Sequence, residues 1–458
     1  MGRLTRLRID SWKIVALIGL AAGIAVFLLS DLPDEPERDV EALIGPSDSA
    51  CRACHASATP FIVEDYLSGP MGIAGVNCTS CHLANPADGD AVSHNGFDIT
   101  VTPSPNDCAV CHPDQVSEFN SSKHFIGWTK MEGVSRYVAL PEEVRSPMCE
   151  GCHNIGKVHA DGSQGKCDSC HTRHSFSAEE ARKPESCGTC HMGPDHPQIE
   201  AYLTSKHGVM YSLESDTWNW SDPTTFTAPV CVTCHMPGGT HNVDEGITIG
   251  GTSSGSTITG TPQPFPMANI TSAAFEENRT AMLAVCTQCH SESFARERLS
   301  AADSVKNETN ALVGEARDIL IQLYNEGLLD PMPAERAANP ITGYNLTLMG
   351  QQLYSNTSGI ETLFFKMYKY HDVTAWKGGY HFSPDYTHWY GWAEVNHDLE
   401  MIKAEDRELR AQENSGILPG NPDDDMDLLP GAIVAAAAIV MIGAVIITRQ
   451  RKPGSPKT

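Results

Sequence analysis

Cysteine and histidine recur in this sequence in one fixed pattern, Cys-x-x-Cys-His, which occurs eight times and uses all 16 cysteines. Two thiols three positions apart can each form a thioether with one vinyl group of a porphyrin. The adjacent imidazole can then bind the iron as its proximal ligand. The motifs are Cys51/Cys54/His55, Cys78/Cys81/His82, Cys108/Cys111/His112, Cys149/Cys152/His153, Cys167/Cys170/His171, Cys187/Cys190/His191, Cys231/Cys234/His235 and Cys286/Cys289/His290. The sequence therefore predicts eight covalently bound haem c groups.

Two other uses of paired cysteines fit this pattern poorly. Disulfide bonds do not need a histidine after every pair, and structural zinc sites take two cysteine pairs for each ion without that fixed histidine. Haem attachment is therefore the preferred interpretation.

Histidines outside the motifs are candidates for the second axial position of each iron. Of the 19 histidines, 11 are not proximal ligands. A haem with two imidazoles is coordinatively saturated and passes electrons, whereas a haem with an open sixth position can bind a substrate. The sequence thus raises the question of which iron lacks a second imidazole.

The elements that position these residues fall into two parts. The motifs crowd into residues 51–290, where the apolar faces of the haems must fill the interior and loops with short helices predominate. Residues 291–412 complete the haem domain with helices, since apolar residues recur at helical spacing in 274–327, 348–370 and 393–412. We predict a mainly α fold with extensive coil, that is, a multihaem cytochrome c architecture with a haem-packed N-terminal part and a helical C-terminal part.

Both ends of the chain are apolar and flanked by basic residues. Residues 1–30 are predicted to be a signal peptide or an N-terminal membrane anchor, and residues 31–50 an acidic linker. Residues 413–427 read as an acidic tether, 428–447 as a transmembrane helix and 448–458 as a basic cytoplasmic tail. Because basic residues flank the outer end of each run, the haem domain is predicted to be membrane-anchored on the extracytoplasmic side, periplasmic or at the cell surface.

The net charge of −25 argues against nucleic acid as a partner, because phosphates would be repelled. The Gly/Ser/Thr-rich segment 246–263 is expected to be a surface excursion between the seventh and eighth motifs.

Three segments resemble the hydroxylamine oxidoreductase family, and in outline the related pentahaem nitrite reductases. They are Cys187-Gly-Thr-Cys-His-Met-Gly-Pro-Asp-His-Pro-Gln-Ile-Glu200 with Ser205-Lys-His-Gly208, Cys231-Val-Thr-Cys-His-Met-Pro-Gly-Gly-Thr-His-Asn-Val243, and Gly379-Tyr-His-Phe-Ser-Pro-Asp-Tyr-Thr-His-Trp-Tyr-Gly391. The resemblance covers residues 50–410. It implies a homotrimer in which the fourth haem, on Cys149, Cys152 and His153, is five-coordinate and catalytic while the other seven are bis-histidine.

Two further roles follow from the resemblance by position. Asp195 and His196 match the acid/base residues above the open iron, where an imidazole beside a carboxylate relays substrate protons. Tyr386 matches the tyrosine that oxidative members crosslink to the catalytic porphyrin of a neighbouring subunit, with Tyr390 as the second candidate. The alternatives are that His196 is a distal ligand and that Tyr386 packs in an aromatic cluster.

Distal ligands are expected from seven histidines, with His371 as the replacement for any that fails. The seven are His94, His124, His174, His207, His241, His381 and His388.

Three functions remain open at the level of sequence. The first is oxidation of hydroxylamine or hydrazine, with electrons passing through the bis-histidine haems to an electron-accepting cytochrome or a membrane quinone pathway. The second is reduction of nitrite or hydroxylamine. The third is a non-catalytic multihaem electron-transfer protein. Two departures from the family, a short interval between the fourth and fifth motifs and the C-terminal apolar run, put the substrate and the electron partner in doubt.

Overall fold

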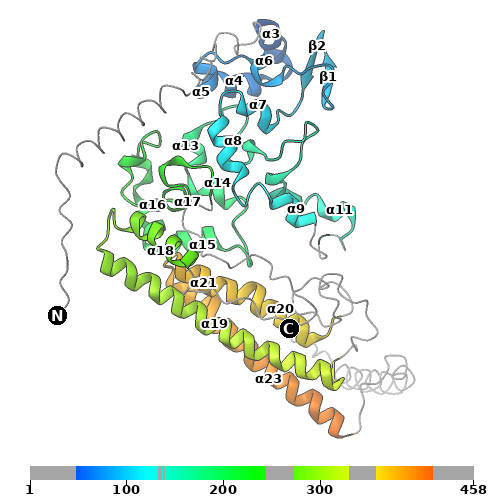
Figure 1. Ribbon diagram of the computed structural model, residues 1–458, viewed down its shortest axis with the longest axis vertical. Helices are drawn as coiled ribbons and strands as arrows, with labels where there is room; N and C mark the ends of the chain where they lie inside the picture. Colours follow the sequence, from blue (N-terminus) through cyan, green and yellow to red (C-terminus); the bar gives the residue numbers. More distant parts are fainter. Residues whose placement is uncertain (1–47, 133–136, 138–139, 244–272, 330–356, 416–458) are drawn as a thin grey trace, which may run out of the picture.

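The first half of the chain folds into short helices joined by loops (Figure 1). The computed structural model describes residues 48–132, 137, 140–243, 273–329 and 357–415. The α-helices up to residue 243 are α3 (Ser49–Ala58), α4 (Pro60–Ser68), α5 (Pro70–Ile73), α6 (Cys78–His82), α7 (Pro105–Ala109), α8 (Pro113–Asn120), α9 (Gly127–Glu132), α11 (Glu142–Arg145), α12 (Glu150–His153), α13 (Ala178–Ala181), α14 (Pro184–Gly188), α15 (Gln198–Leu203), α16 (Lys206–Glu214) and α17 (Cys231–His235). Short 3-10 turns lie at η1 (Asn154–Gly156), η2 (Cys167–Ser169), η3 (Ser215–Thr217), η4 (Pro223–Thr225) and η5 (Pro237–Gly239).

The lengths of these helices follow from local sequence. Proline stands in the first turn of α4, α5, α7, α8 and α14, where its missing N–H is not needed and its fixed φ suits a helix start. Helices α6 and α17 consist of a haem motif and nothing more. One helical turn is enough to bring the two cysteines and the histidine of a motif onto one face.

A β-hairpin, which the sequence analysis did not predict, interrupts the helices. Strands β1 (Ala91–His94) and β2 (Phe97–Thr100) pair antiparallel, with His94 opposite Phe97. Asn95 and Gly96 form the two-residue turn, both with positive φ, at 50° and 87°. An Asn-Gly dipeptide between two short strands is the usual signal for such a turn. The hairpin places His94 at the end of β1.

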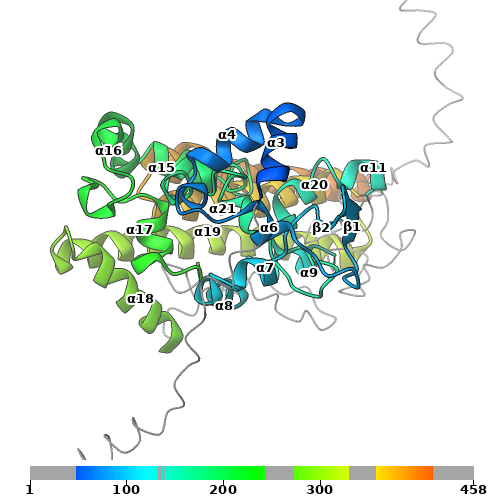
Figure 2. The ribbon, with the colours of Figure 1, turned by 90° about the horizontal axis from the view of Figure 1, so that it is seen from above.

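The second half of the described chain consists of long helices that pack together (Figure 1). They are α18 (Ala273–Cys286), α19 (Glu292–Glu326), α20 (Gly359–Lys366), α21 (Val373–Tyr380), α22 (Pro384–Thr387) and α23 (Ala393–Asn414), with π-helical segments η7 (Met367–Asp372) and η8 (His388–Trp392). Figure 1 places α3 to α7 at one end of the described chain and α19 and α23 at the other, with helices such as α14 and α16 between them, and in the view from above α3 and α4 lie nearest the reader (Figure 2).

Helix α19 shows why this part is helical. Its buried residues recur every three or four positions along 35 residues, and Ser291 caps its N-terminus by accepting a hydrogen bond from the Phe294 N–H. Gly327 ends it in the left-handed conformation, with φ 76°. Leu320 and Leu323 of α19, Phe365 of α20 and Ile402 of α23 are almost fully buried in one apolar core.

The predicted fold class is confirmed, because a loop-rich, motif-bearing part precedes a helical part. The eighth motif divides the expected 274–327 helix into α18 and α19, and the expected 393–412 helix is α23. Of the predicted linker 31–50 the structure describes only residues 48–50: α3 begins at Ser49, and the buried Asp48 accepts a hydrogen bond from the Cys78 N–H.

Several predicted segments lie outside the described residues: the two terminal apolar runs, residues 416–427 of the acidic tether, the basic tail and the 246–263 excursion. The first residues of the predicted tether, 413 and 414, belong to α23. Among the helices that the structure does describe, none combines the length and the apolar character needed to cross a bilayer.

Candidate functional site: a multihaem cavity

One continuous cavity of about 3400 Å³ runs through the motif-bearing part of the molecule. All eight motif histidines line it, as do 15 of the 16 cysteines, Cys54 being the exception. A pocket for a single small ligand measures about 300–1,000 Å³. The cavity therefore has room for several porphyrin groups, and every motif contributes to its wall.

Six motif histidines each face a second imidazole across this cavity. The pairs and the distances between their ring centres are His55–His94 at 6.0 Å, His82–His174 at 6.2 Å, His171–His241 at 6.3 Å, His191–His124 at 6.1 Å, His235–His381 at 6.5 Å and His290–His207 at 6.1 Å. The second member of each pair belongs to the predicted distal set.

These spacings fit a haem iron between the two rings. A metal-bound imidazole nitrogen lies about 2 Å from the metal and its ring centre about 1 Å further, so two rings on opposite sides of one iron have centres about 6 Å apart. The first, second, fifth, sixth, seventh and eighth motifs thus have the geometry of bis-histidine haem sites.

In two of these histidines, His82 and His381, a hydrogen bond to Nδ1 determines which ring nitrogen is available to bind an iron. Nδ1 of His82 lies 2.8 Å from the backbone oxygen of Thr100, and Nδ1 of His381 lies 2.8 Å from that of Lys377. A carbonyl oxygen can only accept, so Nδ1 carries the proton and Nε2 keeps its lone pair for a metal.

Burial favours the neutral form of these imidazoles, which is the form that binds a metal. Desolvation lowers the pKa of His235 to about 4 and that of His191 to about 3, with neighbouring histidines adding to the effect. Desolvation also lowers the pKa of His174 and His207.

Two of the predicted distal ligands, His388 and its replacement His371, lie outside the cavity. His388 packs against tryptophans of η8, with ring centres 4.5 Å from Trp389 and 5.9 Å from Trp392. Nδ1 of His371 lies 2.5 Å from a carboxylate oxygen of Asp398 on α23. Within the described chain, neither side chain lines the cavity or stands opposite a motif histidine.

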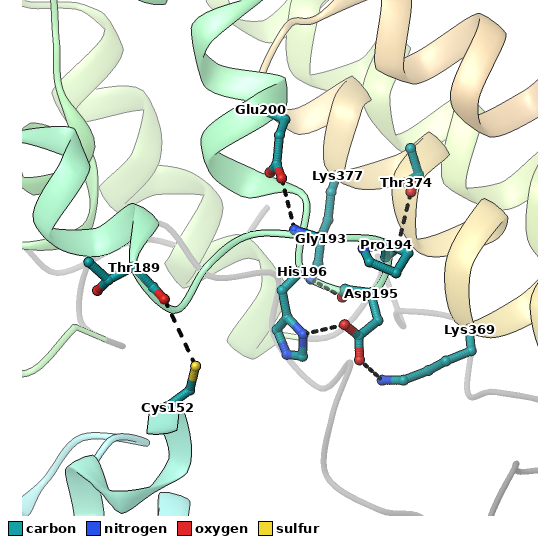
Figure 3. A network of polar contacts seen from close by, with 10 residues as sticks. All are labelled: Cys152, Thr189, Gly193, Pro194, Asp195, His196, Glu200, Lys369, Thr374 and Lys377. Atoms are coloured by element: carbon teal, nitrogen blue, oxygen red, sulfur yellow. Dashed lines mark hydrogen bonds and ion pairs between the residues drawn. The ribbon is translucent and has the colours of Figure 1, made fainter. Parts of the chain in front are cut away.

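The Asp195–His196 pair occupies the loop that follows the sixth motif (Figure 3). Nδ1 of His196 lies 2.9 Å from one carboxylate oxygen of Asp195, and Nζ of Lys369 lies 3.3 Å from the other. Nζ of Lys377 donates to the backbone oxygen of Asp195 at 3.0 Å. Asp195 is therefore held at three points, with its carboxylate shared between His196 and Lys369.

The helical part of the chain shapes this loop. The Thr374 hydroxyl lies 3.4 Å from the backbone oxygen of Pro194, and the Gly193 N–H donates to Glu200 at 2.8 Å. Lys369 comes from η7, and Thr374 and Lys377 come from α21. A π-helical segment shifts the phase of a helix by one residue and is common at functional sites. Here η7 carries Lys369 and directly precedes the turn of α21 that carries Thr374 and Lys377.

The pKa values of Asp195 and of its neighbour Lys377 are both shifted from their ordinary values. Burial by itself would raise the pKa of Asp195, but the hydrogen bond and charge of His196, together with Lys369, hold that pKa below its usual range. Desolvation, and after it the charge of Lys369, lowers the pKa of Lys377 to about 7.

The same loop lies beside the fourth motif. The Cys152 thiol is 4.0 Å from the backbone oxygen of Thr189 and is in hydrogen-bond contact with Cys190. Desolvation, Cys190 and, to a smaller extent, Asp195 raise the pKa of Cys152 to about 11. His153, Asp195 and His196 all line the cavity. The structure thus brings the predicted acid/base pair to the motif of the predicted catalytic haem.

Tyr386 lies in an aromatic cluster at the surface. Its ring centre is 5.1 Å from that of Tyr390, and Tyr390 and Trp389 are 56% and 64% exposed. Tyr386 does not line the cavity of its own chain. Tyr386 itself is partly buried. Burial, and after it the charge of Glu200, raises the pKa of Tyr386, so this tyrosine lies near the Asp195 loop of its own chain. The exposed rings of Tyr390 and Trp389 leave the cluster accessible to a second molecule.

Sequence reasoning missed the lysines that contact Asp195. Lys369 lies in the segment 348–370 that the sequence predicts to be helical, whereas Lys377 lies between two predicted helical segments, and no motif marks either residue. Their spacing gives no signal, because Lys369 lies in the π-helical η7 and Lys377 in α21.

Comparison with known proteins places this geometry among multihaem cytochromes. Residues 74–337, which contain seven of the eight motifs, match the family described as "Seven times multi-haem cytochrome CxxCH". A curated protein of Kuenenia stuttgartiensis, "Probable nitrite reductase-hydroxylamine oxidoreductase fusion protein", is 27% identical over 475 residues, covering 83% of this chain and 54% of that protein. The chain thus spans about half the length of this relative.

Two solved structures are similar to this chain. "Kuenenia stuttgartiensis reducing HAO-like protein complex Kustc0457/Kustc0458" has a TM-score of 0.66 and 26% identity, covering 80% of this chain and 86% of the other. A "Hypothetical multiheme protein" has a TM-score of 0.67 and 22% identity, covering 81% and 97%, and shares the fold.

Proposed function

Because this chain belongs to the multihaem cytochrome CxxCH family and is a distant relative of hydroxylamine oxidoreductase-like proteins, we propose that it is an oxidoreductase acting on a small nitrogen compound. The observation that carries the proposal is the Asp195–His196 contact of 2.9 Å beside the fourth motif. A multihaem protein that only conducts electrons has no need of an acid/base pair facing its haem cavity. Oxidation and reduction of nitrogen compounds, in contrast, move protons together with electrons.

Each group in the proposed site has one role. Cys149, Cys152 and His153 would hold a haem, which would supply a coordination site for the substrate and redox chemistry. Asp195 holds Nδ1 of His196, which leaves Nε2 to accept a proton from the substrate or to return one. Lys369 fixes the second carboxylate oxygen of Asp195 and so keeps the pair in one orientation.

Contacts between motifs suggest the route that electrons take. The Cys152 thiol contacts Cys190, which joins the fourth motif to the sixth, and Cys187 contacts Cys231, which joins the sixth to the seventh. Cys108 contacts Cys167 and joins the third motif to the fifth. We assign electron transfer to the seven haems other than the fourth.

Oxidation of hydroxylamine or hydrazine is the first candidate reaction. It rests on Tyr386, which in a homotrimer would reach the catalytic haem of a neighbouring subunit and crosslink to it. The exposure of the neighbouring Tyr390 and Trp389 supports a contact with a second subunit there. Electrons would leave to a cytochrome or a membrane quinone pathway, with the haem domain held outside the cytoplasm by an apolar terminal segment.

Reduction of nitrite or hydroxylamine is the second candidate. Two observations favour it: the structurally similar Kuenenia complex is described as reducing, and two lysines contact Asp195 beside the cavity.

The test is an assay of the purified holoprotein in both directions. Hydroxylamine and hydrazine are offered with an oxidised dye, and nitrite and hydroxylamine with a reduced one. Turnover that is lost in His196→Ala supports the proposal. A fully loaded protein without turnover in either direction would leave electron transfer alone as its function.

A further inference from the structure

Lys377 places an ammonium group at the wall of the haem cavity. The residue lies on α21, its side chain lines the cavity, and Nζ donates to the backbone oxygen of Asp195 at 3.0 Å. With the side-chain amide of Gln198 turned to satisfy both of its ends, the amide oxygen also accepts from Nζ at 3.0 Å. Both acceptors are uncharged groups, so these bonds orient the ammonium without neutralising it.

No carboxylate of the loop pairs directly with this charge, although the charge of Asp195 acts on it from nearby. Asp195 places one carboxylate oxygen on His196 and the other on Lys369. One oxygen of Glu200 accepts from the Gly193 N–H, and the other is buried without a hydrogen-bond partner. In the described part of the chain, Lys377 forms no ion pair with any carboxylate. The Lys306 amine lies 4.3 Å from the ring centre of Trp376 and adds positive charge near Lys377, although Asp372 partly offsets it.

A partly buried ammonium is costly, because two neutral oxygens and the nearby Trp376 ring replace only part of the solvation that it has lost. For this reason the pKa of Lys377 falls to about 7, and its amine is only partly protonated at neutral pH. An anion bound in the cavity next to Nζ would offset this cost, whereas a neutral molecule of the same size would not. Hydrogen bonds that involve a charged group are also about twice as strong as neutral ones. The arrangement therefore favours one charge class of small ligand.

We propose that Lys377, oriented by the backbone oxygen of Asp195, is a specificity-determining residue that favours a small anionic substrate of the nitrite class over a neutral one. The inference rests on the proposed function and refines it by naming the charge of the substrate. Lys369 has a different role, since its ammonium group forms an ion pair with the Asp195 carboxylate.

The experiment compares nitrite with hydroxylamine in Lys377→Met, Lys377→Arg and a control. Lys403→Met is the matched control, because Lys403 lies on α23 and forms ion pairs with Glu315 and Glu400. Nitrite binding is measured by calorimetry on the oxidised holoprotein without an electron donor, and reduction of both substrates is then measured with a reduced dye.

We expect Lys377→Met to weaken nitrite binding about tenfold or more. We also expect it to raise KM for nitrite much more than KM for hydroxylamine. Lys377→Arg should restore most of the nitrite affinity, and Lys403→Met should bind nitrite as the unmodified protein does.

Equal losses for both substrates would overturn the proposal and give Lys377 a structural role. The same equal loss with an altered haem spectrum would identify a haem propionate as its counter-ion. Absence of turnover in the unmodified protein would instead contradict the proposed function, while the binding measurement would still decide the role of Lys377.

Discussion

His174 faces His82, with ring centres 6.2 Å apart, although it lies only three residues after the motif histidine His171. His171 itself pairs with His241. The short segment after the fifth motif therefore does not serve the haem of that motif. It reaches back to the second motif and ties the two together.

His174→Ala should convert one low-spin haem into a high-spin haem while the haem content stays the same. The reason is that the iron at the second motif loses its distal imidazole and keeps its thioethers. Electron paramagnetic resonance of the oxidised protein and the mass of the denatured chain check this. His241→Ala should remove a different low-spin signal, and the exposed His397 provides the control. If both variants lose the same signal, the pairing described above is incorrect.

His196→Ala should lower kcat in either direction by about 10²- to 10⁴-fold, the usual contribution of a positioned general acid or base. The low-spin signals should remain, because His196 is assigned to proton transfer and not to a metal. Steady-state assays and the paramagnetic resonance spectrum check both parts. The disappearance of a low-spin signal would show instead that His196 is a haem ligand.

Tyr386→Phe should abolish any spectral band of a crosslinked haem and shift activity from oxidation towards reduction, since the crosslink distorts the porphyrin. Tyr390→Phe is the matched control, because its ring centre lies 5.1 Å from that of Tyr386 in the same exposed cluster. Visible spectra and hydroxylamine oxidation are measured for both. An unchanged Tyr386→Phe protein alongside an altered Tyr390→Phe protein would transfer the role to Tyr390.

Asp161→Asn should destabilise the protein at neutral pH by about 1 kcal/mol or less, since the group is exposed and its hydrogen bonds are partly screened. Burial opposes the shift, but hydrogen bonds from Ser104, Ser163 and Asn106 lower the pKa of Asp161 to about 2. A carboxyl group whose pKa is lower in the folded than in the unfolded protein stabilises the fold at pH values above its unfolded-state pKa. This stabilisation is lost as the pH falls through the folded-state pKa. Thermal unfolding should therefore show a gap between the two proteins at pH 6 that narrows between about pH 4 and 2. A gap that stays constant over this range would assign the loss to packing.

Deletion of residues 428–458 should release active protein from the membrane fraction, since a run of this length can span a bilayer. Cell fractionation and a haem stain check the location. Retention of the shortened protein in the membrane would assign the anchor to residues 14–29.

The sequence predicted the haem motifs and the two-part fold because both are local properties. Thioether spacing is fixed within five residues, and helical periodicity within a few turns. It also predicted which histidines are available as distal partners. It could not predict which motif each serves, because His124 meets His191, and His207 meets His290, only through tertiary folding.

The part of the candidate site that sequence reasoning missed comes from the helical half. Lys369 and Lys377 reach the Asp195 loop because η7 and α21 pack against it. The assignment of His388 as a distal ligand stays a prediction; in the described chain η8 directs its ring to Trp389 and Trp392. Periodicity of 3.6 residues does not describe π-helical segments.

If each of the six histidine pairs holds one haem iron, that iron crosslinks two segments of the chain. The link through His235 and His381 joins the loop-rich half to the helical half, and that through His55 and His94 closes a short loop near the start. Crosslinks that close long loops restrict the unfolded chain more than those that close short ones. Loss of the seventh haem should therefore loosen the attachment of one half to the other, whereas loss of the first should loosen only the end of the molecule. The order in which haems are inserted would thus determine the order in which these segments of the chain become crosslinked.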